Sequence, residues 1–128
     1  MTELLCIRLV GDRSPRSARL EAPRVLTGQF SPEVLNDVLV VLSELVSNAV
    51  SHNGGMCTVA IRVIAAHLYV EVHDSDTPGV RRTWDRSGLG HGLGVVQTVA
   101  NRWGIERTPT GKCVWAELPA AHSDTVVF

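Results

Sequence analysis

A single apolar stripe is the clearest regular pattern in the chain. Its members recur every three or four positions, which is the period of an amphipathic α-helix, and they are Leu35, Val38, Leu42, Leu45 and Ala49. Ser31 precedes Pro32 at the start of this segment, and the pair suits an N-cap followed by the first helical turn. Residues 53–55 are Asn-Gly-Gly, which ends a helix. The pattern therefore predicts a helix from about Ser31 to His52.

Alternating apolar residues and turn residues predict the other elements. The expected strands are Leu4–Val10, Cys57–Ala65, His67–His73, Trp103–Arg107 and Cys113–Leu118. The expected helices are Pro15–Thr27, with Ser14 as its N-cap, and Gly92–Arg102. Strands that follow one another without helical crossovers indicate an α+β fold, here a two-layer sandwich of a mostly antiparallel mixed sheet with helices on one face. The segment from Asp74 to Gly90 has no periodicity and is typical of a functional loop.

Length and charge limit the classes of function. A chain of 128 residues fits one domain, residues 1–128, of which 119–128 are expected to form a loose tail. The net charge of -1 gives no general attraction to nucleic acid or to an anionic membrane, so specific sites must carry the function. The chain has no membrane-length apolar run and no signal-peptide pattern. We therefore expect a cytoplasmic protein without direct nucleic-acid or membrane contacts.

Isolated cysteines, histidines and tryptophans give weaker signals. Cys6, Cys57 and Cys113 are far apart in apolar segments, so we interpret them as buried reduced thiols, with a metal or redox role as the alternative. The histidines lack a shared ligand spacing, so no zinc site is predicted at His52, His67, His73 or His122. Trp103 and Trp115 are expected in the core, whereas Trp84 could contact a ligand or a partner.

A second set of isolated residues lies on the first predicted helix. Arg16, Arg19 and Arg24 are expected to form a solvated face. A partner-binding surface is the alternative.

Glu44 and Asn48 lie one turn apart on the predicted Ser31–His52 helix. At about 100° per residue, both are turned roughly 100 to 140° from the centre of the apolar stripe, where they can line a cleft beside the core. An amide oxygen suits Mg²⁺, and a carboxylate can accept a proton from water or from a hydroxyl. For an isolated pair of this kind, a solvated helix face is the favoured explanation.

Two later segments suit a nucleotide. Asp74 ends an apolar strand, where its carboxylate can accept a hydrogen bond from an exocyclic amine such as that of adenine; a turn-forming aspartate is the alternative. Gly90, Gly92 and Gly94 precede an apolar helical pattern, so backbone amides there can face a phosphate, although a flexible loop also fits. No strand directly precedes these glycines and no Gly-Lys-Ser/Thr follows, which excludes Rossmann and Walker loops.

Together these segments resemble the N, G1 and G2 boxes of the histidine-kinase-like ATPases. The resemblance rests on Glu44-Leu-Val-Ser-Asn-Ala-Val-Ser-His52, on Asp74 with the turn that follows it, and on Gly90-His-Gly-Leu-Gly-Val-Val96. Within that group the chain is most similar to the bacterial anti-sigma factor serine kinases. The similarity runs from about Leu4 to Leu118 and implies the Bergerat fold of these ATPases.

The resemblance also implies ATP and Mg²⁺ as cofactors. It implies Glu44 as general base, Asn48 as a Mg²⁺ ligand, Asp74 as the adenine reader and Thr77–Leu89 as a lid. The nucleotide-binding residues that it implies are Asn48, His52, Asp74, Thr77, Gly79, Gly90, His91, Gly92, Leu93, Gly94 and Val95.

The function implied is that of an anti-sigma factor with serine/threonine kinase activity toward an anti-sigma factor antagonist of the STAS type. The expected partners are therefore the antagonist and a sigma factor, and because related kinases often form homodimers, a homodimer is also open. The alternative is a partner-switching module that binds either protein without phosphorylating it. A sensor histidine kinase is disfavoured, because the chain has no room for the helical hairpin that carries a phosphoacceptor histidine.

The sequence departs from the family pattern at three positions. Asp76 replaces the first glycine expected after the G1 aspartate and adds negative charge near the nucleotide. Cys113 stands where a small hydroxyl residue is frequent, so a hydrogen bond near adenine is expected to be lost. His91 stands where arginine is frequent, which leaves as candidates for phosphate or partner contacts Arg81, Arg82 and Arg86.

Overall fold

The computed structural model describes residues 1–11, 13–52, 56–75 and 92–120, without the side chains of residues 51, 52, 75, 92 and 93. The elements in chain order are β1 (Thr2–Val10), α1 (Ser14–Leu26), α2 (Pro32–His52), β2 (Met56–Ile64), β3 (His67–Ser75), α4 (Gly92–Val99), β4 (Arg102–Thr108) and β5 (Gly111–Pro119). This is the order that the sequence predicts.

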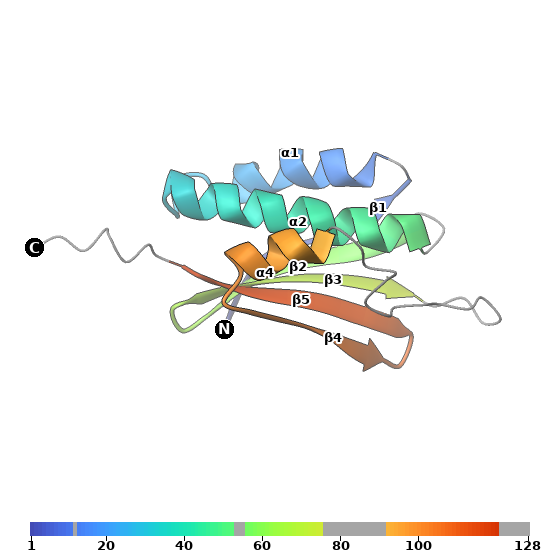
Figure 1. The fold of residues 1–128 in the computed structure, drawn as a ribbon. Coiled ribbons are helices and arrows are strands. Elements are labelled where there is room, and N and C mark those ends of the chain that lie inside the picture. The colour runs from blue at the N-terminus through green and yellow to red at the C-terminus, as the bar shows by residue number, and fades with distance from the viewer. Residues whose placement is uncertain (12, 53–55, 76–91, 121–128) are drawn as a thin grey trace, which may run out of the picture.

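The strands form one sheet in the order β1-β2-β3-β5-β4. Each neighbouring pair of these strands is antiparallel. Figure 1 shows α1, α2 and α4 together on one face of the sheet. The predicted α+β architecture of two layers is therefore confirmed.

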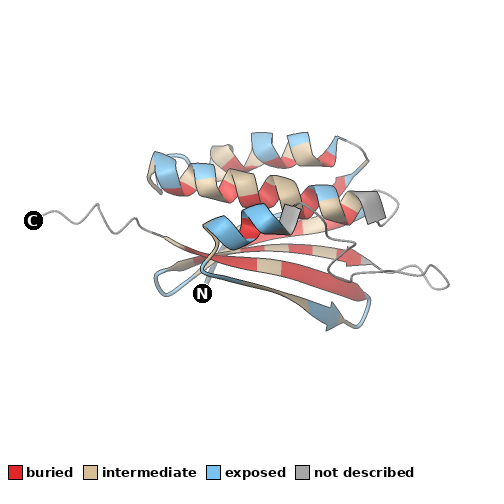
Figure 2. Ribbon diagram, in the orientation of Figure 1, coloured by how far each residue is buried: buried red, intermediate tan, exposed pale blue. Residues whose placement is uncertain are grey.

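The core lies between the helices and the sheet (Figure 2). Four members of the predicted stripe, Val38, Leu42, Leu45 and Ala49, are at most 2% exposed, and Leu35 is partly buried against them. The sheet contributes alternate strand residues, among them Val59, Ile61, Leu68, Val70, Val72, Val114, Ala116 and Leu118. Strand geometry places alternate residues on one face, so a period of two along each strand builds an apolar inner face. None of the helices in the described ranges has both the length and the apolarity of a membrane span.

The two predicted N-caps have different outcomes. The Val34 amide donates to Ser31 Oγ at 3.2 Å, so Ser31 caps α2 as predicted. Ser14 as a cap is wrong, because α1 begins at Ser14 itself and Arg13 occupies the cap position without a side-chain hydrogen bond. The Ser14 hydroxyl instead donates to the Gly11 carbonyl at 2.7 Å, which closes the turn between β1 and α1.

Helix α4 is shorter than the sequence predicts. It ends at Val99, whereas the apolar pattern extends it to Arg102. The Asn101 amide donates to the Glu117 carbonyl at 2.8 Å, and Arg102 already pairs with Glu117 across the sheet. Pairing with β5 therefore ends the helix before its sequence pattern ends.

The predicted start of the loose tail, at residue 119, is too early in the chain. Pro119 is still part of β5, and the Ala120 amide donates to the Ala66 carbonyl at 2.9 Å. These two residues are therefore held against the turn between β2 and β3, and residues 121–128 lie outside the described residues.

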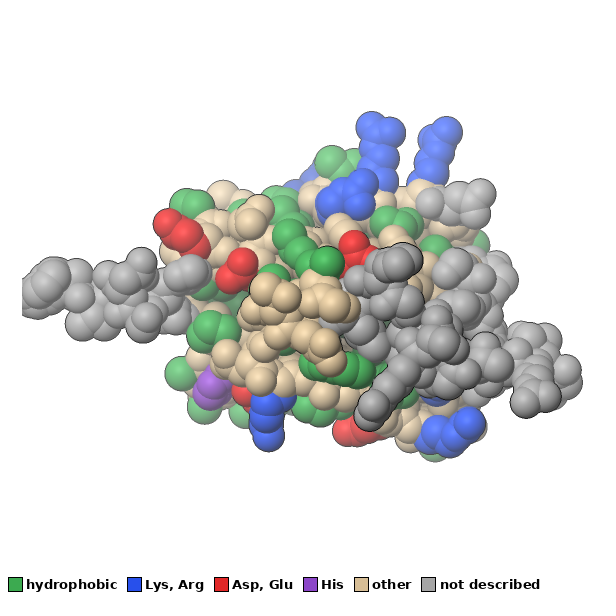
Figure 3. Space-filling model, in the orientation of Figure 1, with side chains coloured by type: hydrophobic (Ala, Val, Ile, Leu, Met, Phe, Trp, Pro, Cys, Tyr) green, Lys and Arg blue, Asp and Glu red, His purple; other side chains and the backbone are tan. Residues whose placement is uncertain are grey.

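The arginines of α1 project into solvent. Arg16, Arg19 and Arg24 are all exposed, and Figure 3 shows cationic side chains over this helix. Arg19 Nη1 donates to Ser43 Oγ at 3.3 Å, and Arg24 lies 4.0 Å from Glu21 one turn earlier. The predicted exposure of these arginines is confirmed, and the partner-binding alternative stays a prediction.

The opposite face of the sheet, called the outer face below, has no described helix over it (Figure 1). Tyr69 on β3 donates its hydroxyl to Glu117 Oε1 at 2.5 Å, and Arg102 Nη2 donates to the same oxygen at 2.7 Å. These hydrogen bonds join β3, β5 and β4 in one row across the sheet. The outer face is therefore tied together by polar side chains.

Trp115 belongs to this outer face, so its predicted place in the core is wrong. Its ring centroid lies 6.5 Å from that of Tyr69. Its indole also covers Gly104 so closely that a Cβ there would lie 2.9 Å from a ring carbon. Trp103, by contrast, packs against the core as predicted. The sequence analysis expects both tryptophans in the core, but the register of β4 and β5 places Trp103 on the inner face and Trp115 on the outer face.

Glu117 should make stability depend on acidic pH. Hydrogen bonds from Arg102 and then Tyr69 hold the pKa of its carboxyl below the ordinary 4.5, so its stabilisation is complete above the unfolded-state pKa and is lost as the pH falls below it. We expect the free energy of unfolding to fall below about pH 4.5 more steeply for the wild type than for Glu117→Gln. Because Arg102 is largely exposed, the difference should be at most about 1 kcal/mol. Urea unfolding between neutral and acidic pH measures it, and parallel profiles would contradict it.

Candidate functional site

Helix α2 places Glu44 and Asn48 at the border between the core and the surface. Both side chains are half-buried, between the fully buried Leu45 and Ala49 on one side and the exposed Ser47 on the other. Nδ2 of Asn48 is itself buried. Residues four apart on a helix are neighbours on one face, so the carboxylate and the carboxamide are presented side by side.

Asp74 lies near the end of β3 on the inner face of the sheet, toward the helices. Its side chain is 5% exposed, and one carboxylate oxygen, Oδ1, is buried. Cys57, a member of the core cluster, is close enough for Asp74 to influence it. Burial first, and the Asp74 charge second, raise the pKa of the Cys57 thiol to about 11. The inner face at the end of β3 therefore carries a buried carboxylate next to the core.

Strand register corrects the position of Cys113. Asp74 is opposite Lys112 on β5, and Cys113 is opposite His73. Because successive residues of a strand point to opposite faces, Lys112 shares the inner face with Asp74 and Cys113 lies on the outer face. The expected loss of a hydrogen bond near adenine at Cys113 is therefore wrong, since that side chain points away from Asp74's face.

Lys112 is a residue that the sequence analysis missed. It is only 3% exposed, which is rare for a lysine unless the charge has a counterpart. Counting alternation back from the buried Val114 and Ala116 would have placed Lys112 on the inner face.

The backbone of α4 is unobstructed at Gly94. α4 begins at Gly92, and a Cβ built on Gly94 would meet nothing within 4 Å. Thr98 donates its hydroxyl to the Gly94 carbonyl at 3.0 Å, and Val95 is 37% exposed. Among the described residues, there is therefore free space beside the α4 backbone at Gly94, two residues after the helix begins.

These pieces come together at one end of the molecule. α2 packs against both β3 and α4. Figure 1 shows the carboxyl half of α2, the end of β3 and the beginning of α4 at the same end. Glu44, Asn48, Asp74 and Gly94 thus come from three elements that meet there.

Several predicted site residues lie outside the described residues. They are the His52 and Leu93 side chains, together with Thr77, Gly79, Gly90, His91 and the Thr77–Leu89 segment as a whole. Asp76, Trp84 and the arginines 81, 82 and 86 also fall there.

The cysteines divide into two groups. All three are free thiols. Cys57 and Cys113 are buried as predicted, whereas Cys6 is exposed. Cys6 pairs with Ala60 from the edge strand β1 and lies on the outer face, so its predicted burial is wrong.

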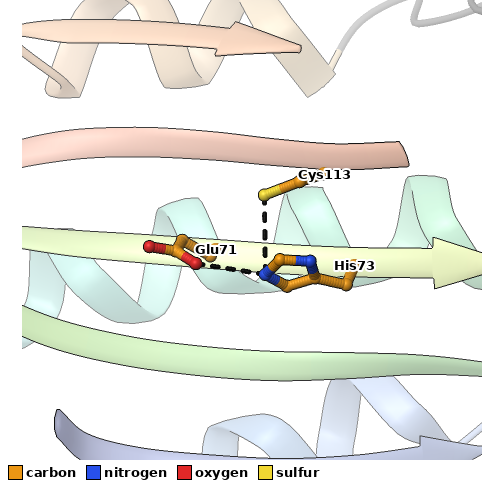
Figure 4. Close-up of side chains that lie close together, drawn as sticks. All are labelled: Glu71, His73 and Cys113. Carbon is orange, nitrogen blue, oxygen red and sulfur yellow. Dashed lines mark hydrogen bonds and ion pairs between the residues drawn. The ribbon is translucent and has the colours of Figure 1, made fainter. Parts of the chain in front are cut away.

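Cys113 joins a cluster on the outer face that the sequence analysis did not predict. Figure 4 shows Glu71 of β3 and Cys113 of β5 both directed at one ring nitrogen, Nε2, of His73 on β3. Glu71 and His73 are two residues apart on one strand, which puts them on the same face. No local sequence pattern indicates that Cys113 lies near His73, because only the register between β3 and β5 places the two residues opposite each other.

The comparisons with known proteins give one positive result. No curated protein matches the chain. The family model of the histidine kinase-like ATPase domain matches residues 12–118, a range that begins before α1 and extends almost to the end of β5. The chain therefore belongs to the histidine kinase-like ATPase domain family.

Proposed function

We propose that this protein uses Mg²⁺-bound ATP to phosphorylate a serine or threonine of an anti-sigma factor antagonist, and that it also binds a sigma factor. Membership of the histidine kinase-like ATPase domain family supports a general ATP-binding regulatory role. The observation that carries the finer proposal is the pairing of Glu44 with Asn48 at the border of the core, beside the end of β3 that bears the buried Asp74.

These residues fit ATP and Mg²⁺. The Asn48 amide oxygen is a hard ligand of the kind that Mg²⁺ takes in small number. Bound Mg²⁺ would neutralise phosphate charge during phosphoryl transfer. Glu44 can accept the proton of the attacking hydroxyl, while Asp74 can accept a hydrogen bond from the exocyclic amine of adenine. The amides at the start of α4 can face the phosphates.

A partner-switching module without kinase activity is the second candidate. The buried Lys112 opposite Asp74 favours it, because a cation on the same face competes with adenine for the carboxylate. Asp76, two residues after Asp74, adds charge to the same region. In this case the protein binds an antagonist or a sigma factor without transferring phosphate.

Phosphotransfer from labelled ATP separates the two candidates. The purified chain is incubated with γ-labelled ATP, Mg²⁺ and each STAS-type antagonist of the native cell, with a chelator of Mg²⁺ as control. The kinase proposal expects Mg²⁺-dependent label on a serine or threonine of one antagonist. Stable binding to an antagonist without any label would favour the module and contradict the kinase.

The proposed partners need a separate test. Copurification from the native cell, with and without ATP, should recover an antagonist or a sigma factor identified by mass. Recovery of neither class under both conditions would contradict the proposed partners.

Asp74→Asn should weaken ATP binding by about 10- to 100-fold, the effect of losing a hydrogen bond to a charged group of about 1.5–3 kcal/mol. Asparagine keeps the size of the side chain but offers an amide donor where adenine also offers one. Calorimetric titration with a non-hydrolysable ATP analogue and Mg²⁺ measures the change.

Glu106→Gln is the matched control for Asp74→Asn. It neutralises an exposed carboxylate on β4, on the outer face, and should leave nucleotide affinity unchanged. Because Asp74 is buried, thermal unfolding of both variants must show that they are folded. Equal affinity of folded Asp74→Asn and wild type would exclude Asp74 as the adenine reader.

A further inference from the structure

The outer face of the sheet contains a groove of about 480 Å³. Its walls include Arg62, Tyr69 and Trp115, and its lining includes Glu71, His73 and Cys113. These last three residues, called the outer-face triad below, come from β3 and β5 (Figure 4). The groove therefore gives small solutes access to a carboxylate, an imidazole and a thiol at one place.

The three donor atoms of the outer-face triad are close enough for one ion. The donor atoms all lie within 4.8 Å of one another. His73 Nε2 is 3.1 Å from Glu71 Oε1 and 3.6 Å from Cys113 Sγ. One imidazole nitrogen is thus next to both other donors.

These separations match the edges of a tetrahedral zinc site. Zinc bonds of about 2.3 Å to sulfur and about 2.0 Å to nitrogen or oxygen, at the tetrahedral angle, separate sulfur from nitrogen by about 3.6 Å and nitrogen from oxygen by about 3.3 Å. The observed distances of 3.6 and 3.1 Å are close to these values. A metal ion could therefore enter with only small movements of the side chains.

A neighbouring arginine holds the carboxylate in place. Arg62 Nη1 lies 3.7 Å from Glu71 Oε2, the oxygen that does not face His73, and Arg62 Nε lies 3.9 Å from Glu3 on β1. Groups that orient a ligand in this way strengthen metal sites. Glu71 and Cys113 are also mostly shielded, with side-chain exposures of 17% for Glu71 and 7% for the Cys113 residue.

The groove lining holds two carboxylates, those of Glu71 and Glu106, and the guanidinium of Arg62. Arg62 pairs with the Glu71 oxygen that does not face His73, so the other oxygen of Glu71 is the one next to the imidazole. A metal that binds Cys113 as a thiolate would release the thiol proton.

We propose that Glu71, His73 and Cys113 bind a zinc-class divalent metal ion, with the fourth coordination position open toward the groove. A ligand set of thiolate, imidazole and carboxylate suits zinc and disfavours Mg²⁺, which prefers oxygen ligands. Three protein ligands with one open position is the arrangement of zinc sites that accept water or a small ligand. The site is separate from the proposed nucleotide chemistry, because His73 and Asp74 point to opposite faces of β3.

Metal titration of the complete, tag-free and reduced chain tests this proposal. Zn²⁺ competed against a chromophoric chelator should give one site per chain with a dissociation constant in the micromolar range or below. Co²⁺ should give the thiolate-to-metal charge-transfer band and the visible spectrum of tetrahedral coordination. Both readouts are independent of ATP.

Variants identify the ligands. Cys113→Ser and His73→Ala should each weaken Zn²⁺ binding by at least about 100-fold, since loss of even an indirect partner costs about 10- to 100-fold. Matched controls are Cys6→Ser, an exposed thiol on the same face, and His67→Ala, a histidine on the same face of β3. Both should bind as the wild type does.

Three results would overturn the proposal. The first is a wild-type dissociation constant for Zn²⁺ weaker than millimolar. The second is Zn²⁺ binding by Cys113→Ser within threefold of the wild type. The third is a loss of Zn²⁺ affinity in the two control variants as large as the loss in the ligand variants. If Cys113→Ser does not fold, the Co²⁺ spectrum of the wild type decides, because a spectrum without the thiolate band excludes Cys113 as a ligand.

Discussion

Glu44→Gln should slow phosphotransfer by about 100- to 10,000-fold, the usual contribution of a positioned general base. Glutamine has nearly the shape of glutamate but cannot accept a proton. The half-buried position of Glu44 on α2 should accommodate it without a change in packing. Because the proposed nucleotide contacts come from Asn48, Asp74 and the start of α4, the affinity for ATP should change by only a few fold.

Single-turnover phosphotransfer to the antagonist, measured beside ATP affinity, separates chemistry from binding in Glu44→Gln. Glu33→Gln is the matched control, because Glu33 is an exposed glutamate in the first turn of the same helix. Wild-type rates for Glu44→Gln would exclude Glu44 as the base. A parallel loss of ATP affinity would instead assign it to nucleotide binding.

Leu42→Ala should lower the free energy of unfolding by about 2–5 kcal/mol. Leu42 is fully buried on the face of α2 that packs against the rest of the core. Alanine would leave a cavity there, and the loss combines the transfer of the missing methyl groups with the cost of that cavity. Leucine and alanine are both strong helix formers, so propensity should contribute little.

Urea unfolding with an unchanged m-value measures this loss. Leu20→Ala supplies the same substitution on α1, where Leu20 is 57% exposed, and should change stability by no more than about 0.5 kcal/mol. Similar losses in both variants would mean that burial of Leu42 is not the cause.

The helical part of the fold was predictable because each signal is local. The apolar stripe around Leu42 indicates which side of α2 is buried, and Ser31 supplies the hydroxyl that caps the start of this helix. The end of α4 was not predictable in this way, because Asn101 hydrogen-bonds to β5 and Arg102 pairs with it, and the helix ends before them.

The candidate nucleotide site was predictable as a set of motifs. Spacing alone puts Glu44 and Asn48 on one helical face, and Asp74 at the end of an apolar strand. The sequence did not predict that Lys112 is buried opposite Asp74, because a lysine is usually assigned to the surface.

By itself, the sequence determined the elements, their order and the candidate nucleotide-binding motifs, since hydrophobic period, capping and turn chemistry act within a few residues. Only the tertiary structure decided which strand residues face each other and which face of the sheet they occupy. The structure therefore places Trp115 and Cys113 on the outer face, where Cys113 lies close to Glu71 and His73. The physical reason is strand register: a shift of one residue moves every side chain of a strand to the other face, and register is fixed by pairing between distant segments.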